Sequence, residues 1–222
     1  MNEHAKGAFL GITMDTDAPM LYRALIEGVT YEMMYNLEKL DVSFNSVSSL
    51  APLAQCPKLT WLDVSNNTIS SINGIGNLQL LSSLSLNYNS LTAISILGGC
   101  LQLKELSFTN NQIADISALA SLNNLEIIDF SYNNVYALPE WSQTSALRVV
   151  QGSHNSVSSI YMLGGMSNLT YVSMDYNKLT DISALANCQN LVQVNVYGNT
   201  IGDVSALASH SIIVNYDPTL QQ

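Results

Sequence analysis

Apolar and polar positions follow a repeating 22-residue pattern along this chain. Residues 103–124, LKELSFTNNQIADISALASLNN, carry apolar side chains at positions 1, 4, 6, 11, 14, 17 and 20 of the pattern. The leading leucine recurs without a gap from Leu37 to Leu191. The asparagine at position 9 keeps the same step at Asn45, Asn67, Asn89, Asn111, Asn133, Asn155, Asn177 and Asn199. Eight consecutive repeats over residues 37–212 predict a solenoid.

The segment ELSFT indicates how one repeat folds. Leu106 and Phe108 fall on one side of a short strand, and Glu105, Ser107 and Thr109 fall on the other. One such strand cannot bury its apolar side alone, so the copies are expected to stack into a parallel sheet with a continuous core. We expect the position-9 asparagines to be structural, bonding backbone groups of their own and the next repeat.

The opening LxxLxLxxN, continued as xIxxIxxL, resembles the leucine-rich repeat family, most closely the 22-residue class of bacterial internalins and protein phosphatase regulators. The resemblance implies an α/β solenoid with a curved parallel sheet on its concave face. It also implies a module that binds a protein or peptide ligand on that face, and no enzymatic activity.

Residues 1–36 do not follow the repeat. The segment GAFLGITMDTDAPMLYRALIEGVTYEMMYNLEKL, at 7–40, resembles part of the nucleotide-binding half of the FGGY sugar kinases, such as xylulokinase and glycerol kinase. The matching residues are Gly7, Gly11, Thr13, Leu21, Arg23, Ala24, Glu27 and Gly28. The family's catalytic aspartate region and glycine-rich nucleotide loop have no counterpart, so no kinase activity is implied. Asp17 as N-cap and Pro19 in the first turn predict a helix over about 18–36, a fused or engineered cap for the first repeat.

The core positions contain one gap and three thiols. Gly152 stands at position 6, where Phe130 and Met174 occupy the neighbouring repeats, so we expect those two side chains to lean into the vacated space. Cysteine occurs only at position 20, another core position, in Cys56, Cys100 and Cys188. Even the nearest pair is two repeats apart, about 10 Å at the spacing of parallel strands, which predicts free, buried thiols.

Beyond the eighth repeat, Ile213 and Tyr216 are expected to keep the period for half a repeat within a C-terminal tail, 213–222. Proline at 218 then ends the pattern because it cannot donate to a further strand. We therefore divide the chain into a cap segment at 1–36, the repeats at 37–212 and this tail.

Net charge narrows the possible partners. The formal charge is -10 with seven Lys and Arg, which argues against nucleic acid and anionic membrane surfaces. No apolar run approaches the length of a membrane-spanning helix, and the first residues lack the pattern of an export leader. We expect a monomer that is cytoplasmic as written, or at the cell surface or secreted if a leader was removed.

Motifs that carry chemistry are missing: the sequence has no HExxH, CxxC, Walker loop or GxSxG. We predict no catalytic residues, no cofactor and no metal. One alternative stays open, because Asp41 and Asp63 occupy the same outward position in adjacent repeats and could hold calcium. Solvated acids are the commoner interpretation of such a pair.

Side chains at positions 3 and 8 of the repeats are expected on the concave face, outside the core. The candidate ligand-binding residues are Phe44, Trp61, Tyr88, Ile127, Tyr132, Val149, His154, Tyr171, Tyr176 and Tyr197. The densest apolar group among them is expected on four consecutive strands of the C-terminal half. Positions 5 and 7 are mostly Ser, Asp and Asn, and aromatic anchors among adaptable polar groups are typical of protein-binding surfaces.

Other interpretations of these residues also fit the sequence. Tyrosine favours strands, so the aromatic groups need not bind anything. The chain could instead be a structural or engineered scaffold with no evolved ligand, as the kinase-like cap suggests, or an enzyme remnant. The leading hypothesis is a protein-binding module.

Overall fold

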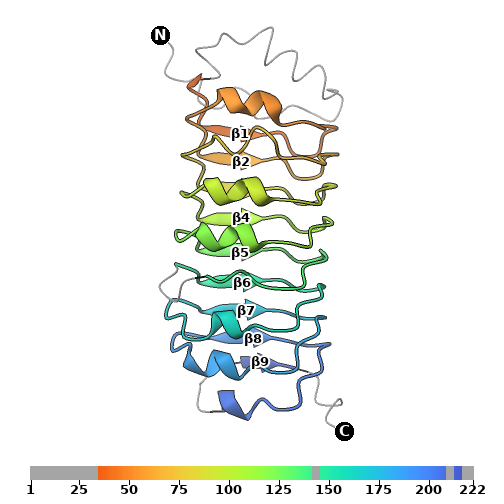
Figure 1. Cartoon of the computed structure of the whole chain (residues 1–222), viewed down its shortest axis with the longest axis vertical. Coiled ribbons are helices and arrows are strands. Elements are labelled where there is room, and N and C mark those ends of the chain that lie inside the picture. Colours follow the sequence, from red (N-terminus) through yellow and green to blue (C-terminus); the bar gives the residue numbers. More distant parts are fainter. Residues whose placement is uncertain (1–34, 142–145, 209–212, 217–222) are drawn as a thin grey trace.

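Within the described residues, nine three-residue strands stack side by side in chain order as one parallel sheet (Figure 1). They are β1 (Lys39–Asp41), β2 (Trp61–Asp63), β3 (Ser83–Ser85), β4 (Glu105–Ser107), β5 (Ile127–Asp129), β6 (Val149–Gln151), β7 (Tyr171–Ser173), β8 (Gln193–Asn195) and β9 (Ile213–Asn215). This computed structural model describes residues 35–141, 146–208 and 213–216. The predicted α/β solenoid with a parallel sheet is confirmed. The predicted cap helix lies outside the described residues except for its last two positions, as does the proline at 218.

The register of the sheet follows the repeat period from β1 to β8. Leu84 stands opposite Leu106, and Leu106 opposite Ile128, so the buried position-4 side chains form one column. The backbone ladder continues beyond the strands, because the N–H of Phe108 donates to the Asp129 carbonyl at 2.9 Å. Pairing therefore extends past the three residues of each strand.

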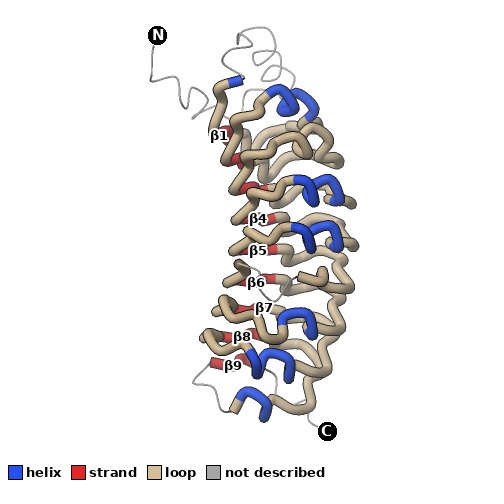
Figure 2. Tube along the Cα trace, turned by 60° about the vertical axis from the view of Figure 1, so that its left-hand side comes forward, coloured by secondary structure: helices blue, strands red, loops and turns tan. Residues whose placement is uncertain are grey.

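The return half of most repeats is a short 3-10 helix on the side opposite the sheet (Figure 2). These helices are η2 (Ala51–Gln55), η3 (Ser95–Gly99), η4 (Ser117–Ser121), η5 (Tyr161–Leu163), η6 (Ser183–Asn187) and η7 (Ser205–Leu207). A 3-10 turn is short enough to bring the chain back to the sheet within one repeat. In Figure 2 the column of strands bows toward the helices at its middle, so the strand side is the hollowed, concave one.

Between η4 and η5 the return segment lacks a described 3-10 helix. Trp141 is buried there, and its indole Nε1 donates to the Leu119 carbonyl of η4 at 3.1 Å. A buried indole requires such a partner for its N–H. Trp141 thus joins this irregular segment to the regular repeat before it.

The predicted compensation around Gly152 is confirmed. A Cβ atom placed on Gly152 would stand 2.2 Å from Phe130 Cζ and 2.9 Å from Met174 Sδ. Both neighbouring side chains therefore occupy the space that a side chain at this position would need. Phe130 also stacks on Phe108, with ring centroids 6.3 Å apart.

The position-9 asparagines tie each repeat to the one before it. Asn133 Nδ2 donates to the carbonyls of Phe130 and Ser131 in its own repeat and of Phe108 in the preceding repeat, at 2.9–3.3 Å. Its Oδ1 accepts the N–H of Ile113, also in the preceding repeat, at 3.0 Å. The structural role is as predicted, but the expected bond to the next repeat is wrong. Outside its own repeat, the carbonyl and the N–H that the side chain bonds both belong to the preceding repeat.

The first asparagine illustrates the same dependence. Asn45 Nδ2 donates to the carbonyls of Val42 and Ser43, but no repeat in the described part of the chain precedes it. Its buried Oδ1 has no hydrogen-bond partner in the described part of the chain.

The period changes at the C-terminal end. Ile213 pairs with Gln193, and Val214 with Val194. Ile213 is consequently an exposed strand residue rather than the leading core residue, so the expectation that it keeps the repeat period is wrong. Val214 and Tyr216 pack partly buried against the core. The last turn is two positions shorter than the others, which moves Ile213 from the leading core position to the outward third position.

The cysteines are free and buried, as predicted. Burial raises the pKa of all three thiols, Cys56, Cys100 and Cys188. Thiols in this state are poor nucleophiles.

Candidate functional site

Outward side chains at positions 3 and 5 of the strands form the surface that we call the strand face. Ile127, Val149 and Tyr171 stand opposite one another on β5, β6 and β7, and each is half-buried. Tyr171 OH accepts a hydrogen bond from Asn195 Nδ2 at 2.8 Å. Trp61 occupies the same third position on β2. Four of the sequence-predicted site residues therefore lie on this face.

The position-8 residues, which we call the rim column, follow the strands rather than belong to them. They are Phe44, Asn66, Tyr88, Asn110, Tyr132, His154, Tyr176 and Gly198. All eight have left-handed backbone, with φ between 52° and 58° for the seven residues with side chains and 67° for the glycine. Asn and Gly tolerate this conformation, whereas for other residues it is unfavourable by roughly 1–2 kcal/mol.

Aromatic rings of the rim column stack on one another in the C-terminal half. The rings of Tyr132 and His154 have centroids 4.2 Å apart, and those of His154 and Tyr176 are 4.5 Å apart. Tyr197, at position 7, completes the row edge-on to Tyr176 at 5.6 Å. A Cβ on Gly198 would lie 2.6 Å from the Tyr176 ring, so the glycine leaves room for that ring.

A polar strip at positions 5 and 7 lies between these rings and the apolar row at position 3 of the strands. Asp175 Oδ1 accepts the N–H of Tyr197 at 2.8 Å, and its Oδ2 accepts the hydroxyl of Ser173 at 3.1 Å. Ser153 Oγ lies 3.1 Å from Ser173 Oγ. The C-terminal group expected from the sequence is therefore two apolar rows with hydrogen-bonded polar groups between them.

Negative charge predominates across this surface. Among the described residues of this surface, Lys39 is the only Lys or Arg. Five carboxylates lie on the surface or at its edge. The carboxylates are those of Asp41, Asp63, Glu105, Asp129 and Asp175. In the C-terminal half, from β5 to β8, the described surface carries two carboxylates and no Lys or Arg. A cationic ligand is favoured electrostatically.

The paired aspartates of the strand face have structural partners. Asp41 and Asp63 are in register on β1 and β2. Asp41 Oδ1 accepts the N–H of Ser43, and Asp63 Oδ1 accepts that of Ser65, both at 2.9 Å. One oxygen of each carboxylate is thus engaged within its own repeat. Across the described residues, no group of three or more His, Cys, Asp or Glu is placed to hold a metal ion.

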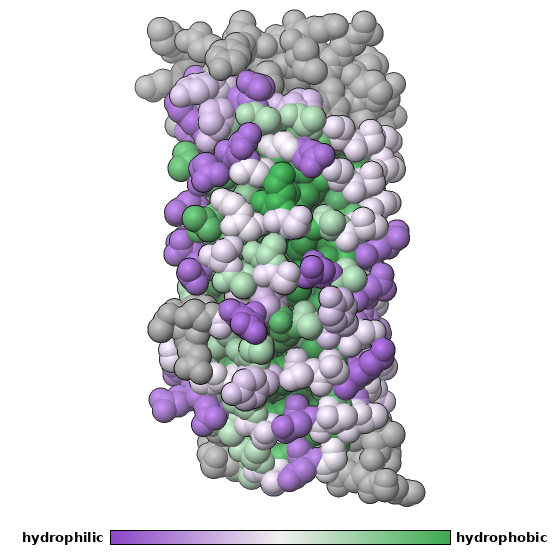
Figure 3. All heavy atoms as spheres, in the orientation of Figure 1, coloured by the Kyte–Doolittle hydropathy of each residue, from purple (hydrophilic) through white to green (hydrophobic). Residues whose placement is uncertain are grey.

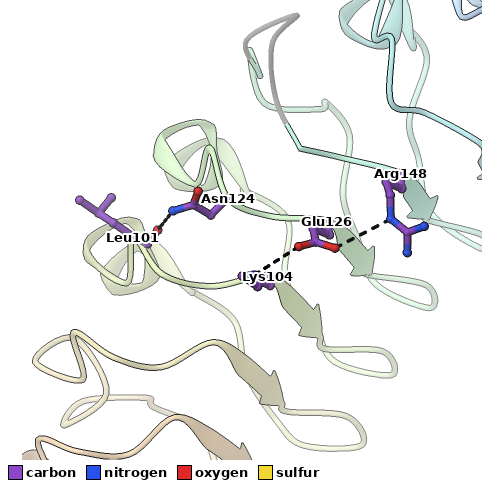
Figure 4. A network of polar contacts seen from close by, with 5 residues as sticks. All are labelled: Leu101, Lys104, Asn124, Glu126 and Arg148. Atoms are coloured by element: carbon purple, nitrogen blue, oxygen red, sulfur yellow. Dashed lines mark hydrogen bonds and ion pairs between the residues drawn. The ribbon is translucent and has the colours of Figure 1, made fainter.

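Three charged residues at position 2 form a ladder where the strands begin, at the other end from the rim column (Figure 4). Glu126 lies 3.6 Å from Lys104 Nζ and 3.8 Å from Arg148 Nε. Asn124, two residues before Glu126, donates to the Leu101 carbonyl at 2.9 Å. The ion pairs are largely exposed, so each contributes little to stability. Sequence reasoning did not identify this ladder, although the order Lys, Glu, Arg at the spacing of the repeats indicates it.

The side of the return segments presents a different surface. Figure 3 shows strongly polar residues along both flanks of the molecule, with apolar and polar residues mixed between them. A surface hollow of about 430 Å³ lies by η5 and η6, lined mainly by small polar groups such as Ser158, Thr180 and Asp181. Within the described residues, no helix is long and apolar enough to cross a membrane.

Sequence reasoning placed the position-8 aromatic residues outside the core but missed their backbone conformation and stacking. Asn66, Asn110 and Gly198 occupy the same column as the rings, and Asn and Gly are the residues that favour left-handed backbone. Their presence at position 8 was the available signal. His154, between two tyrosine rings, is the residue whose role only the structure defines.

The family model described as "Leucine Rich repeats (2 copies)" matches residues 35–77, 79–121, 101–142 and 167–209. Internalin C2 from Listeria monocytogenes is a similar solved structure, with 31% identity and a TM-score of 0.61 over 84% of this chain and 74% of that one. The leucine-rich repeat domain of APL1B has 21% identity and a TM-score of 0.73, over 96% of this chain and 64% of that one. The latter likeness concerns the fold alone.

A third similar structure contains a bound partner. It is the ectodomain of the plant receptor kinase GASSHO1/SCHENGEN3 from Arabidopsis thaliana in complex with CASPARIAN STRIP INTEGRITY FACTOR 2. Its identity with this chain is 26% and the TM-score is 0.74, over 83% of this chain and 24% of that ectodomain. Comparison with curated proteins gave no significant match.

Proposed function

This chain belongs to the leucine-rich repeat family, and from that membership we propose that it is a binding module that takes a protein or peptide ligand on its concave face. The strand face and the rim column together supply the contact surface. The module needs no catalytic group, cofactor or metal for this role.

The observation that carries the proposal is the exposure of aromatic rings on left-handed backbone. Phe44, Tyr88 and Tyr132 are 63%, 55% and 51% exposed, and all have positive φ. An aromatic residue on left-handed backbone destabilises the protein, and an exposed ring offsets little of that loss through burial. Asn or Gly would suit the position better. Strand preference does not explain them, because the rim column lies outside the strands. A role in contact with a ligand does.

The rigidity of the rim column favours the same role. Stacked rings such as His154 between Tyr132 and Tyr176 lose little further conformational freedom on binding. Polar groups of the adjoining strip, among them Ser153 and Asp175, can exchange hydrogen bonds with a ligand. The complex of the plant receptor ectodomain with its named partner is consistent with ligand binding by a similar solenoid.

A pair of matched double variants tests the proposal. Proteins captured by the immobilised full chain are identified by mass spectrometry, and one purified partner is then titrated by calorimetry. Tyr171→Ala with Tyr197→Ala, both on the concave side, should weaken binding by about 2 kcal/mol or more. Tyr136→Ala with Tyr161→Ala removes two exposed tyrosines elsewhere and should leave the affinity unchanged.

Circular dichroism of the parent and both double variants shows whether folding is preserved. If the Tyr136 and Tyr161 pair abolishes binding while the Tyr171 and Tyr197 pair does not, the ligand lies elsewhere and the proposal is wrong. Failure to capture any partner at micromolar concentrations also counts against it.

A further inference from the structure

The N-terminal half of the rim column alternates rings with shorter side chains. Phe44, Tyr88 and Tyr132 stand two repeats apart, and Asn66 and Asn110 occupy the positions between them. In the C-terminal half His154 fills the equivalent position with a ring, at 4.2 and 4.5 Å from its two neighbours. A planar group therefore fits between two rings of this column. At Asn66 and Asn110 the side chain is too short to fill that space, and we call these two positions the open rungs.

Both sides of the open rungs are aromatic. Tyr132 stacks on His154 through one face, so its other face is turned toward Asn110. Within the described residues, no ring contact involves Phe44 or Tyr88. The Asn110 amide makes one long contact, 3.4 Å to Thr109 Oγ1, and can donate to a ligand carbonyl.

The separation of the open rungs selects one peptide conformation. They are two repeats apart, which is roughly 9–10 Å at the spacing of parallel strands. A polyproline II helix brings every third side chain to the same side after about 9.3 Å. An extended strand repeats on one side after about 6.7 Å, and an α-helix after about 5.4 Å for one turn or about 10.8 Å for two, so the polyproline II spacing is the closest match.

The charge of the surface selects the side chain. This surface has five carboxylates and one cationic side chain, Lys39, so it favours a cationic ligand. Asp63 and Glu105 lie in the same repeats as the two open rungs. Arginine is the cation whose planar guanidinium stacks between aromatic rings, whereas the lysine ammonium is a hydrated point charge. From this geometry we infer that the open rungs bind two arginines, three residues apart, of a cationic peptide in polyproline II conformation. The inference rests on the proposed function and specifies its partner.

Fluorescence anisotropy with synthetic peptides tests this inference on the full chain. The probe is fluorescein-labelled (Arg-Pro-Pro)4. One control, (Lys-Pro-Pro)4, has the same charge and spacing without the planar group. A second control has the composition of the probe with its four arginines in one block. We expect saturable binding of the probe and about tenfold weaker binding of each control.

Variants of the rim column locate the site. Asn110→Tyr fills one open rung with a residue that the column already accepts at Tyr88 and Tyr132, so the fold should be retained. It should weaken the probe about tenfold. Asn110→Ala leaves the rung open but removes the amide, so it should weaken the probe clearly less than Asn110→Tyr does, by about threefold. Asn134→Tyr adds the same side chain at an exposed position outside the column and should have no effect.

Absence of saturable probe binding overturns the inference. So does equal affinity for the block peptide, or equal affinity of Asn110→Tyr and the parent. If a partner captured as above depends on Tyr171 and Tyr197 but the chain does not discriminate among these peptides, this inference is wrong while the proposed function stands.

Discussion

Gly152 offers a quantitative test of how adjacent repeats share core volume. Gly152→Ala adds one carbon at a buried position where the nearest atoms, Phe130 Cζ and Cε2, are 2.2 and 2.3 Å from the ideal Cβ. Replacing Gly in an extended segment normally stabilises a protein by about 0.5–1 kcal/mol, because Gly loses more backbone freedom on folding. Overpacking is unfavourable by about 1–3 kcal/mol. We expect a net loss of about 1–2 kcal/mol of unfolding free energy.

A compensating substitution separates this cause from others. Phe130→Leu removes the ring atoms that conflict with the new Cβ, and by itself leaves a cavity that destabilises the protein by about 1–2 kcal/mol. In the double variant the added methyl group occupies part of that cavity. The loss of unfolding free energy in the double variant should therefore be smaller than the sum of the losses in the two single variants, by about 1 kcal/mol or more. Phe108→Leu, two repeats from Gly152, should instead combine additively with Gly152→Ala.

Urea unfolding followed by circular dichroism measures each free energy. Equal m-values across the set are required, because a solenoid can lose cooperativity when one interface is weakened. Additivity of Phe130→Leu and Gly152→Ala within about 0.3 kcal/mol would falsify the packing argument.

Three further outcomes follow from the hydrogen bonds and burial. Asn133→Ala leaves the Ile113 N–H and the Phe108 carbonyl without the side chain that bonds them. Urea unfolding should therefore show a loss of roughly 2–5 kcal/mol of unfolding free energy. The control Asn134→Ala, at the exposed neighbouring residue, should lose less than about 0.5 kcal/mol. Comparable losses for the two variants would contradict this role. Backbone and hydroxyl hydrogen bonds from Ser183 lower the pKa of Asp181, so its stabilising effect is present at neutral pH and lost as the pH falls below about 4. The urea midpoints of the parent and Asp181→Ala should therefore differ at pH 7 and converge in acid; a constant difference would refute the linkage. The three buried thiols should react with a thiol reagent only as fast as the chain unfolds, and rapid reaction of the native protein would show that they are accessible.

The repeat period determined the parallel sheet, its register and its core. Successive side chains alternate between the two sides of a strand, so Leu106 and Phe108 share the apolar side, and only stacking of neighbouring repeats buries that side. The polar asparagine inside this pattern requires backbone partners, which identified it as structural. Local patterning was sufficient because each repeat contacts mainly its neighbours.

The candidate site was only partly determined by the sequence. Alternation along a strand indicates which side chains leave the core, and so it predicted Ile127 and Tyr171 on the outward side. It does not indicate that the chain adopts left-handed backbone three positions after the strand, because that conformation depends on pairing with the next turn. The N–H of Tyr132 donates to the Ser153 carbonyl at 2.8 Å in this arrangement.

Contacts between repeats decided the remaining features. The stacking of His154 between two tyrosines depends on the distance between turns, which no single repeat contains. The shorter last turn, which pairs Ile213 with Gln193, reflects a choice of register that the core favours because Val214 then meets Val194. Sequence periodicity determines which residues recur. Packing between adjacent repeats determines which faces and backbone groups of those residues meet, because the contact energies arise between residues a whole repeat apart in the chain.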